Sequence, residues 1–208
     1  MRSESEPGGQ QRSFIEEARR RQIIASAVEV ISEVGYANAS LARIAEHAGI
    51  SKGVISYHFQ GKDDLMTQLV IQLYVSAAEV VAPEVIAAVG ARNRVLAYIE
   101  SNLAFIDANR RYVAALTEVV RNLRDADGQL HFASSDESEI LEPLVALLRE
   151  GQLEGEFGEF DPVFMGKSIR DAIDGAGARV VRETDFDLRG YTAHTARLFD
   201  LATRKAEE

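Results

Sequence analysis

Apolar residues recur every three to four positions along most of the chain, and this period predicts helices. We expect the first helix to run from about Phe14 or Glu16 to Val34 and to end at Gly35. A second long helix is expected from residue 62 to about 81, before Pro83. Further helices are expected at 84–89, 92–109, 112–126, 138–152, 162–182 and 188–204. No segment alternates as a strand would, so the sequence predicts an all-α protein.

Residues 40–62, SLARIAEHAGISKGVISYHFQGK, predict two short helices joined by a sharp turn at Gly49. Ser40 and Ser51 stand where their hydroxyls can cap the two helices. The apolar positions of the two helices are Leu41, Ile44, Ala45 and Ala48, then Val54, Ile55 and Phe59. This arrangement is typical of a helix-turn-helix, although an ordinary corner between two helices would show part of the same pattern.

The face of the second helix opposite its apolar positions is small and polar, as a helix that enters the DNA major groove requires. Residues next to this face that carry a helix-capping hydroxyl or a positive charge can bind phosphate groups of the DNA backbone. The predicted DNA-contacting residues are Ser40, Arg43, Ser51, Lys52, Gly53, Ser56, Tyr57, His58 and Lys62. Arg19–Arg21 in the first helix are either further phosphate contacts or solvated charges.

The stretches IA (44–45), AGIS (48–51), HF (58–59) and KDDL (62–65), together with Gly53, resemble the N-terminal domain of the TetR/AcrR family of bacterial repressors. The resemblance covers about residues 23–69. It departs at Val54, where threonine is frequent, and at Ser56, where a tyrosine usually contacts the DNA backbone. Tyr57 is a candidate to replace that contact. The resemblance implies a helical second domain that binds a small molecule and forms a homodimer.

We therefore expect a disordered tail at 1–13, a three-helix DNA-binding domain at 14–74, and a helical ligand-binding and dimerisation domain at 75–208. Polar and aromatic residues near apolar faces are candidates for an effector pocket: Tyr98, Phe105, Tyr112, Glu118, Arg121, Asn122, His131, Phe132 and Phe164. Broad apolar faces are candidates for the dimer interface, with internal core as the alternative: Leu144, Leu147, Leu148, Ile169, Ile173, Ala176 and Val180.

The net charge of −10 is distributed unevenly, which keeps DNA binding possible. Residues 1–62 carry 8 Lys and Arg against 7 Asp and Glu, whereas the rest of the chain carries 15 against 26. The chain has no cysteine, so it has no disulfide or thiolate metal site, and the four histidines lack ligand spacing. We expect no metal or cofactor. No signal sequence and no apolar run of membrane-spanning length is apparent, so we expect a cytoplasmic protein.

These patterns, together with the family resemblance, predict a ligand-responsive, homodimeric repressor released from a palindromic operator by a small molecule. A DNA-binding regulator without a small-molecule effector, partner-controlled or constitutive, is the alternative. An enzyme is not expected, because the G-x-S-x-G, H-E-x-x-H and P-loop motifs are missing. The sequence does not identify the effector, the operator, or whether the protein represses or activates.

Overall fold

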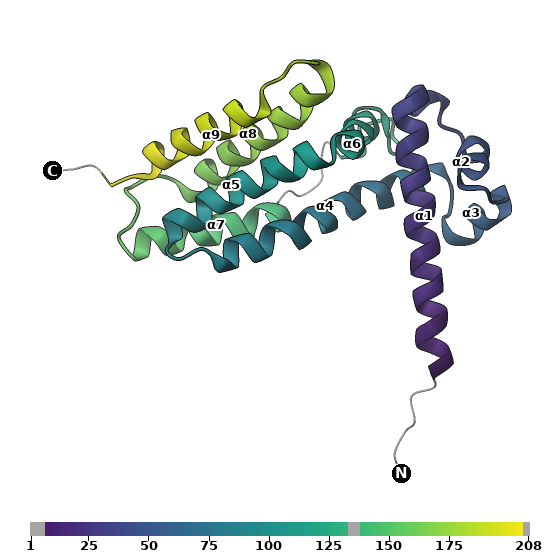
Figure 1. Ribbon diagram of the computed structural model, residues 1–208, viewed down its shortest axis with the longest axis horizontal. Coiled ribbons are helices and arrows are strands. Elements are labelled where there is room, and N and C mark those ends of the chain that lie inside the picture. Colours follow the sequence, from purple (N-terminus) through teal and green to yellow (C-terminus); the bar gives the residue numbers. More distant parts are fainter. Residues whose placement is uncertain (1–6, 133–137, 206–208) are drawn as a thin grey trace, which may run out of the picture. The chain divides into compact units, whose positions relative to one another are not determined.

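The computed structural model of the protein describes residues 7–132 and 138–205, and these residues form nine helices without a strand, which confirms the all-α prediction (Figure 1). The helices are α1 (Pro7–Asn38), α2 (Leu41–Ala48), α3 (Lys52–His58), α4 (Lys62–Ala87), α5 (Ala91–Ala108), α6 (Arg110–Asn122), α7 (Ser138–Leu153), α8 (Pro162–Arg182) and α9 (Leu188–Thr203). The expectations for residues 1–6 and for the loop at 133–137 lie outside the described residues.

The helices divide into two compact units. Unit 1 contains the chain up to Gln72 together with Ala115–Leu130, and unit 2 contains Leu73–Ala114 and the chain from His131 onward. Helices α4 and α6 therefore each contribute residues to both units.

Helix α1 begins at Pro7, seven residues before the first start expected from the sequence. Proline suits a first helical position, because its fixed φ matches the helix and its missing N–H would have no partner there. At the other end, Gly35 has φ 74° and ψ 162°, a backbone conformation that residues with a side chain rarely adopt. The expected end of the long helix at Gly35 is confirmed, and a short helical turn at 36–38 follows it.

Unit 1 is built on α1, with α2 and α3 packed beside its C-terminal half (Figure 1). Its core combines apolar side chains from all four of the first helices. The fully buried members are Ile23, Ile31, Ile44, Ile55, Leu65, Met66 and Leu69. Because one face of α3 is fixed in this core, its opposite face is held outward in a defined orientation.

Helix α4 continues through Pro83 to Ala87, so the expected break before the proline and the separate helix at 84–89 are wrong. Proline removes the hydrogen bond to the carbonyl of Glu79, but this part of the helix is exposed and water can satisfy that carbonyl. By length and composition alone α4 could also cross a membrane, contrary to our reading of the sequence. Leu65, Met66 and Leu69 of this helix are nevertheless fully buried in unit 1, as in a core helix.

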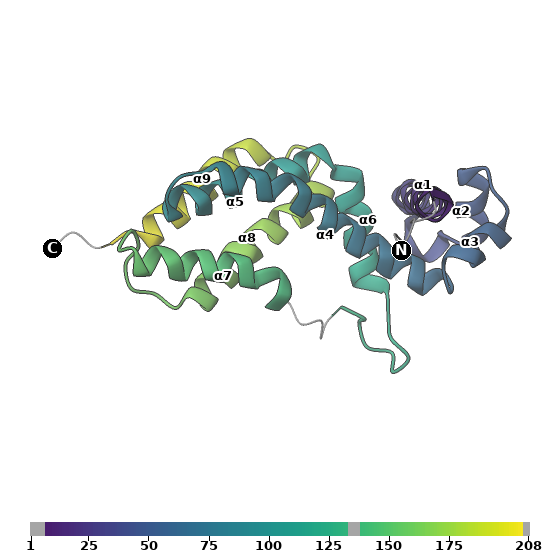
Figure 2. The ribbon, with the colours of Figure 1, turned by 90° about the horizontal axis from the view of Figure 1, so that it is seen from below.

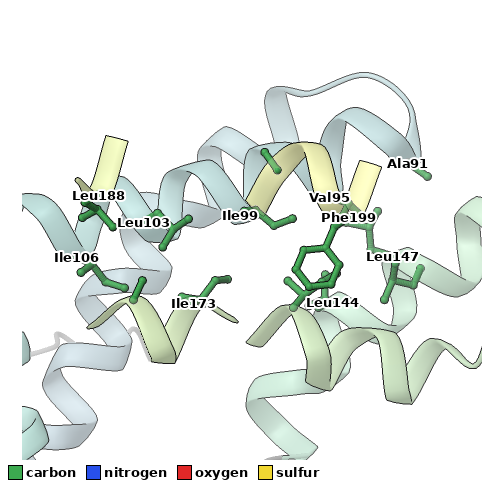
Figure 3. Packing of buried hydrophobic residues seen from close by; sticks show 14 of the residues in the cluster. Ala91, Val95, Ile99, Leu103, Ile106, Leu144, Leu147, Ile173, Leu188 and Phe199 are labelled. Atoms are coloured by element: carbon green, nitrogen blue, oxygen red, sulfur yellow. The ribbon is translucent and has the colours of Figure 1, made fainter. Parts of the chain in front are cut away.

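Unit 2 is a bundle in which α5 packs against α7, α8 and α9 (Figures 1 and 2). Side chains from all four helices converge on one apolar core (Figure 3). Ile99 and Leu103 on α5 meet Ile173 on α8 and Phe199 on α9 within this core. Gly177 of α8 permits a close approach, since an added Cβ would lie 3.2 Å from Val113.

The residues predicted to form a dimer interface lie inside this core, and that prediction is corrected here. All seven are at most 9% exposed: Leu144, Leu147, Leu148, Ile169, Ile173, Ala176 and Val180. Their apolar faces meet one another across the α7–α8 contact within one chain, so they have almost no surface to offer a second copy. Apolar side chains that are exposed on α8 and α9 are Val163, Phe164, Val181, Leu198 and Leu201.

Candidate nucleic-acid interface

The turn between α2 and α3 has the backbone geometry that its sequence predicts. Ser40 accepts a hydrogen bond from the Arg43 backbone N–H at 3.3 Å and so caps α2. Gly49 ends α2 in the left-handed conformation, with φ 66° and its N–H bonded to carbonyls of α2. Ser51 has the backbone conformation of a cap, but its side chain makes no capping hydrogen bond, contrary to our expectation. Its exposed hydroxyl remains able to bind another molecule.

Helix α3 separates an apolar face from a polar one. Ile55 and Phe59, at 0% and 2% exposure, are buried in unit 1, and Val54 is half-buried. The residues exposed on and before this helix are Ser51, Lys52, Gly53, Ser56 and Tyr57. Seven residues make a helix about 10 Å long, which a major groove about 12 Å wide can accept. The exposed face therefore has the size and the hydrogen-bonding groups for reading base edges.

Tyr57 is the most prominent side chain of this face, with 75% of its surface exposed. Its ring meets the His58 ring edge-on, with centroids 5.0 Å apart and planes 87° apart. His58 is itself half-buried, so it supports the tyrosine ring from one side. A large aromatic side chain held outward in this way can reach a phosphate with its hydroxyl group.

Gly53 occupies the first turn of α3 although the protein has room for a larger residue there. A Cβ added at this position would meet only the Ser51 hydroxyl, at 3.6 Å, which is an ordinary contact. Its φ is not positive, so the backbone does not require glycine either. Glycine in a helix costs about 1 kcal/mol relative to alanine. The absence of a side chain is thus not explained by packing inside the chain and is compatible with close approach of a ligand.

Arg20 of α1 fixes the C-terminal end of α3, a role that the sequence analysis missed. It donates to the His58 carbonyl at 2.5 Å and to the Gln68 side chain at 3.2 Å. Its guanidinium lies over the Phe59 ring, 4.5 Å from the centroid. The sequence does indicate this position, because Arg20 precedes Ile23, Ile24 and Ala27 at helical spacing. It therefore lies on the buried side of α1.

The other cations near α3 differ in how many contacts they make with the rest of the chain. The Lys62 ammonium donates a hydrogen bond to the backbone carbonyl of Tyr36 at 2.7 Å. It also lies 4.2 Å from the centroid of the Tyr36 ring. Burial lowers the pKa of the Lys62 ammonium, although nearby Asp63 opposes this effect. Lys62 therefore holds the fold together and is not placed on the open polar face. Lys52 and Arg43 are exposed, and Arg43 makes one long bond to the Asn38 carbonyl at 3.4 Å.

The residues predicted for an effector pocket are divided between the two units. Glu118, Arg121 and Asn122 belong to unit 1, and the last two are exposed. Phe164 is 73% exposed, because the buried side of α8 is formed by Gly166 and Ile169 and does not include Phe164.

The remaining candidates lie in unit 2 but in different surroundings. Phe105 is core, and Phe132 packs edge-on against His131 with ring centroids 4.8 Å apart. The Tyr112 hydroxyl is buried without a hydrogen-bond partner among the described residues, and burial raises the pKa of Tyr112 to about 12. Tyr98 is half-buried and interacts with Arg170 of α8.

A small surface cavity in unit 2 is bordered by residues that the sequence analysis did not choose. It encloses about 30 Å³. Its lining residues are Tyr74, Ile140, Leu141, Lys167, Arg170, Asp171 and Asp174. The charged residues of this cavity lie three or four positions apart on α8. This spacing alone is typical of an ordinary solvent-exposed helix face, so the sequence did not single them out.

Comparison with known sequences identifies the N-terminal part of the chain. Residues 23–69 match the family model described as bacterial regulatory proteins, tetR family. The HTH-type transcriptional regulator BetI 1 of Chromohalobacter salexigens is 45% identical over 64 residues, which are 31% of this chain and 32% of that protein. BetI of Escherichia coli is 48% identical over 48 residues, or 23% and 25% of the two chains. The match thus spans about a third or less of the length of these relatives.

Comparison with solved structures extends the similarity in fold to both units. The fatty acid degradation regulator FadR from Bacillus halodurans superposes with a TM-score of 0.75 at 24% identity, covering 88% of this chain and 99% of that one. FadR from Bacillus subtilis, solved in complex with stearoyl-CoA, gives a TM-score of 0.74 at 24% identity and covers 86% and 96%. At these identities the structures show a shared fold and nothing more specific.

Proposed function

We propose that the protein is a cytoplasmic homodimeric repressor that reads a palindromic operator with α3, because residues 23–69 match the model of the tetR family of bacterial regulatory proteins. One observation carries the proposal: Ile55 of α3 and Phe59 at its C-cap are buried, while Ser56 and Tyr57 of the same helix are exposed. A twofold dimer presents two such helices, and these match two half-sites on one side of the DNA.

Within this proposal the exposed residues divide into two groups. Gly53 and Ser56 lie on the face that meets base edges, whereas Lys52 and Tyr57 contact phosphates. Ser40, Arg43 and Ser51 are further phosphate contacts at the ends of α2 and α3. The dimer forms through the exposed apolar side chains of α8 and α9, including Leu198 and Leu201, in place of the buried residues that the sequence suggested.

We further propose that unit 2 binds a small-molecule effector whose binding changes the spacing of the two α3 helices and so releases the operator. The buried Tyr112 hydroxyl and the cavity at Arg170 support a polar ligand. The similarly folded FadR of Bacillus subtilis was solved with stearoyl-CoA, which supports a role in ligand binding for such a helical body. A regulator without an effector would have the same α3 but no ligand-dependent change in DNA affinity.

The test uses an operator duplex obtained from random DNA by selection with the purified protein. Fluorescence anisotropy is measured for the parent, Lys52→Ala and Tyr57→Ala across salt concentrations, and sedimentation monitors the oligomeric state. Each variant should bind the operator more weakly and remain dimeric. Lys52→Ala should also lower the slope of log affinity against log salt by about 1, because it removes a charge that neutralises one phosphate, whereas Tyr57→Ala removes a neutral hydroxyl and should leave the slope unchanged. Unchanged operator binding by both variants would contradict this assignment of α3.

A further inference from the structure

Arg170 is a cation enclosed near the middle of α8, with only 18% of its side chain exposed. One guanidinium nitrogen donates to the Asn102 side chain of α5 at 3.4 Å, and Asn102 is itself 7% exposed. The Tyr74 ring lies 6.0 Å from the guanidinium carbon. A guanidinium remains charged when it is buried, so this position requires an anion beside it.

The anion that the chain supplies is Asp174, one turn further along α8. Arg170 donates to its carboxylate through Nε at 3.1 Å and through Nη2. Burial by itself would lower the pKa of Arg170, but Asp174 and the Tyr98 hydroxyl outweigh it and the pKa is raised. Asp174 is 53% exposed, so its carboxylate can turn back into water at little cost, whereas Arg170 cannot be left without a partner.

The cavity lies directly at this ion pair. Its volume of about 30 Å³ is sufficient for a small polar group such as a carboxylate, since a site for one water needs roughly 10–15 Å³ on the same measure. Lys167 adds a second cation to the rim, and Ile140 and Leu141 form its apolar side. The cavity thus combines a guanidinium fork paired with Asp174, a second cation beside the Asp171 carboxylate, and an apolar wall.

We propose that this cavity is the head-group subsite for an anionic effector, whose carboxylate or phosphate replaces Asp174 on Arg170 while its apolar part lies against Ile140 and Leu141. The planar guanidinium fork matches both head groups. Lys167 and Arg170 balance Asp171 and Asp174 in the free protein, and the exchange replaces one anionic partner of Arg170 by another. This inference rests on the proposed effector response of unit 2.

The test compares four amphiphiles that share an eight-carbon chain and differ in head group. Octanoate, octyl phosphate, octan-1-ol and octylammonium are titrated below their critical micelle concentrations into the full-length protein without DNA. Calorimetry and thermal unfolding monitor binding. Octanoate or octyl phosphate should bind and raise Tm, and the stronger of the two identifies the head group. Equal binding of all four probes, or binding of octylammonium or octan-1-ol alone, would overturn the proposal.

Two variants and one control make the assignment specific. Arg170→Met keeps an apolar stem and should abolish binding of the anionic probes. Asp174→Asn removes the internal competitor, so it should tighten their binding by roughly tenfold, the effect of one charge-assisted hydrogen-bond exchange. Asp107→Asn neutralises a comparably exposed carboxylate of unit 2, paired with Arg110, and should leave binding unchanged.

A structural ion pair without a ligand role would give no tighter binding in Asp174→Asn, and that result would refute the subsite even if Arg170→Met were unstable. Because no DNA is present in these measurements, their failure would leave the DNA-binding proposal untouched. Loss of operator binding in the Lys52 and Tyr57 variants, conversely, does not depend on this cavity.

Discussion

Arg20 of α1 donates a hydrogen bond of 2.5 Å to the backbone carbonyl of His58, the last residue of α3. The same guanidinium lies over the ring of Phe59, the residue that ends the helix. A cation at a helix C-terminus satisfies free carbonyl groups and interacts favourably with the helix dipole. Through this contact α1 fixes the direction in which the exposed face of α3 points.

Replacing Arg20 by alanine should therefore affect specific DNA binding through the position of α3. The carbonyl of His58 would lose its partner, and we expect unfolding free energy to fall by roughly 1–3 kcal/mol. Affinity for the selected operator should fall at least tenfold, while affinity for random DNA and its salt dependence stay near the parent values. Denaturant unfolding and anisotropy measure these quantities.

Arg21 provides the matched control, because it is adjacent in sequence but exposed, and among the described residues it forms a surface ion pair with Glu17 at 3.3 Å. Arg21→Ala should leave stability within about 0.5 kcal/mol of the parent, as surface ion pairs contribute little. If Arg20→Ala instead lowered the salt slope by about 1 and left stability intact, Arg20 would be a direct phosphate contact and the positioning role would be wrong.

Gly53 gives a prediction in which stability and DNA binding change in opposite directions. Gly53→Ala meets only the Ser51 hydroxyl, so the helix should gain about 0.5–1 kcal/mol in unfolding free energy. Operator affinity should fall at least tenfold because the added methyl group keeps the DNA away.

The control for Gly53 is Gly175 in α8, where an added Cβ meets nothing within 4 Å. Gly175→Ala should raise stability by a similar amount and leave DNA binding unchanged. Operator binding by Gly53→Ala equal to that of the parent would show that the glycine does not serve close approach to DNA.

The helix-turn-helix of unit 1 could be predicted from the sequence, because the residues that determine it act over short distances along the chain. The cap at Ser40, the turn at Gly49 and the spacing of Ile44 and Ile55 each act within a few residues. The hydrogen bonds that fix Arg20 and Lys62 join residues 38 and 26 positions apart, and spacing along one helix does not reveal such partners.

Asp200 of α9 makes the stability of unit 2 depend on pH. Its side chain, 10% exposed, binds Arg92 of α5 at 2.5 Å and Arg204 at 2.6 Å. The hydrogen bond from Arg92 is the main cause that lowers the Asp200 pKa in the folded protein, with Arg204 adding to it against the effect of burial. The stabilisation is fully present above the unfolded pKa of about 4 and is lost as the pH falls through the lower folded value.

We therefore expect Asp200→Asn to lower unfolding free energy at pH 7 by roughly 1–3 kcal/mol, the value of hydrogen bonds to a charged group. The difference from the parent should shrink as the pH falls below about 4, where the parent carboxylate also becomes protonated. Denaturant unfolding at pH 7 and at pH 3 measures both values. A difference that is the same at the two pH values would contradict the account.

Tyr112 carries a buried hydroxyl without a partner among the described residues. Leaving such a group unpaired costs roughly 1–3 kcal/mol, so Tyr112→Phe should stabilise the ligand-free protein by about 1 kcal/mol or more. Urea unfolding of the two proteins measures the difference. A clear loss of stability in Tyr112→Phe would mean that the hydroxyl is already hydrogen-bonded in the free protein.

The packing of unit 2 was predicted less completely than the helix-turn-helix of unit 1, for a physical reason. Helical periodicity separates apolar from polar faces, but it does not distinguish a face buried by the same chain from one buried by a second copy. Leu144 and Ile169 therefore appeared as interface candidates although they meet inside unit 2. Phe164 illustrates the opposite error, since an aromatic residue in a first helical turn can face outward.

The central claim is that the exposed face of α3 reads specific DNA as one half of a twofold pair. The most direct measurement is selection of random duplex DNA by the purified protein near 0.1 M salt, followed by sequencing, with Gly53→Ala in parallel. We predict that the parent enriches a palindrome with half-sites about one helical turn apart and that the variant does not. Equal enrichment by both proteins, or no enrichment by the parent, would contradict it.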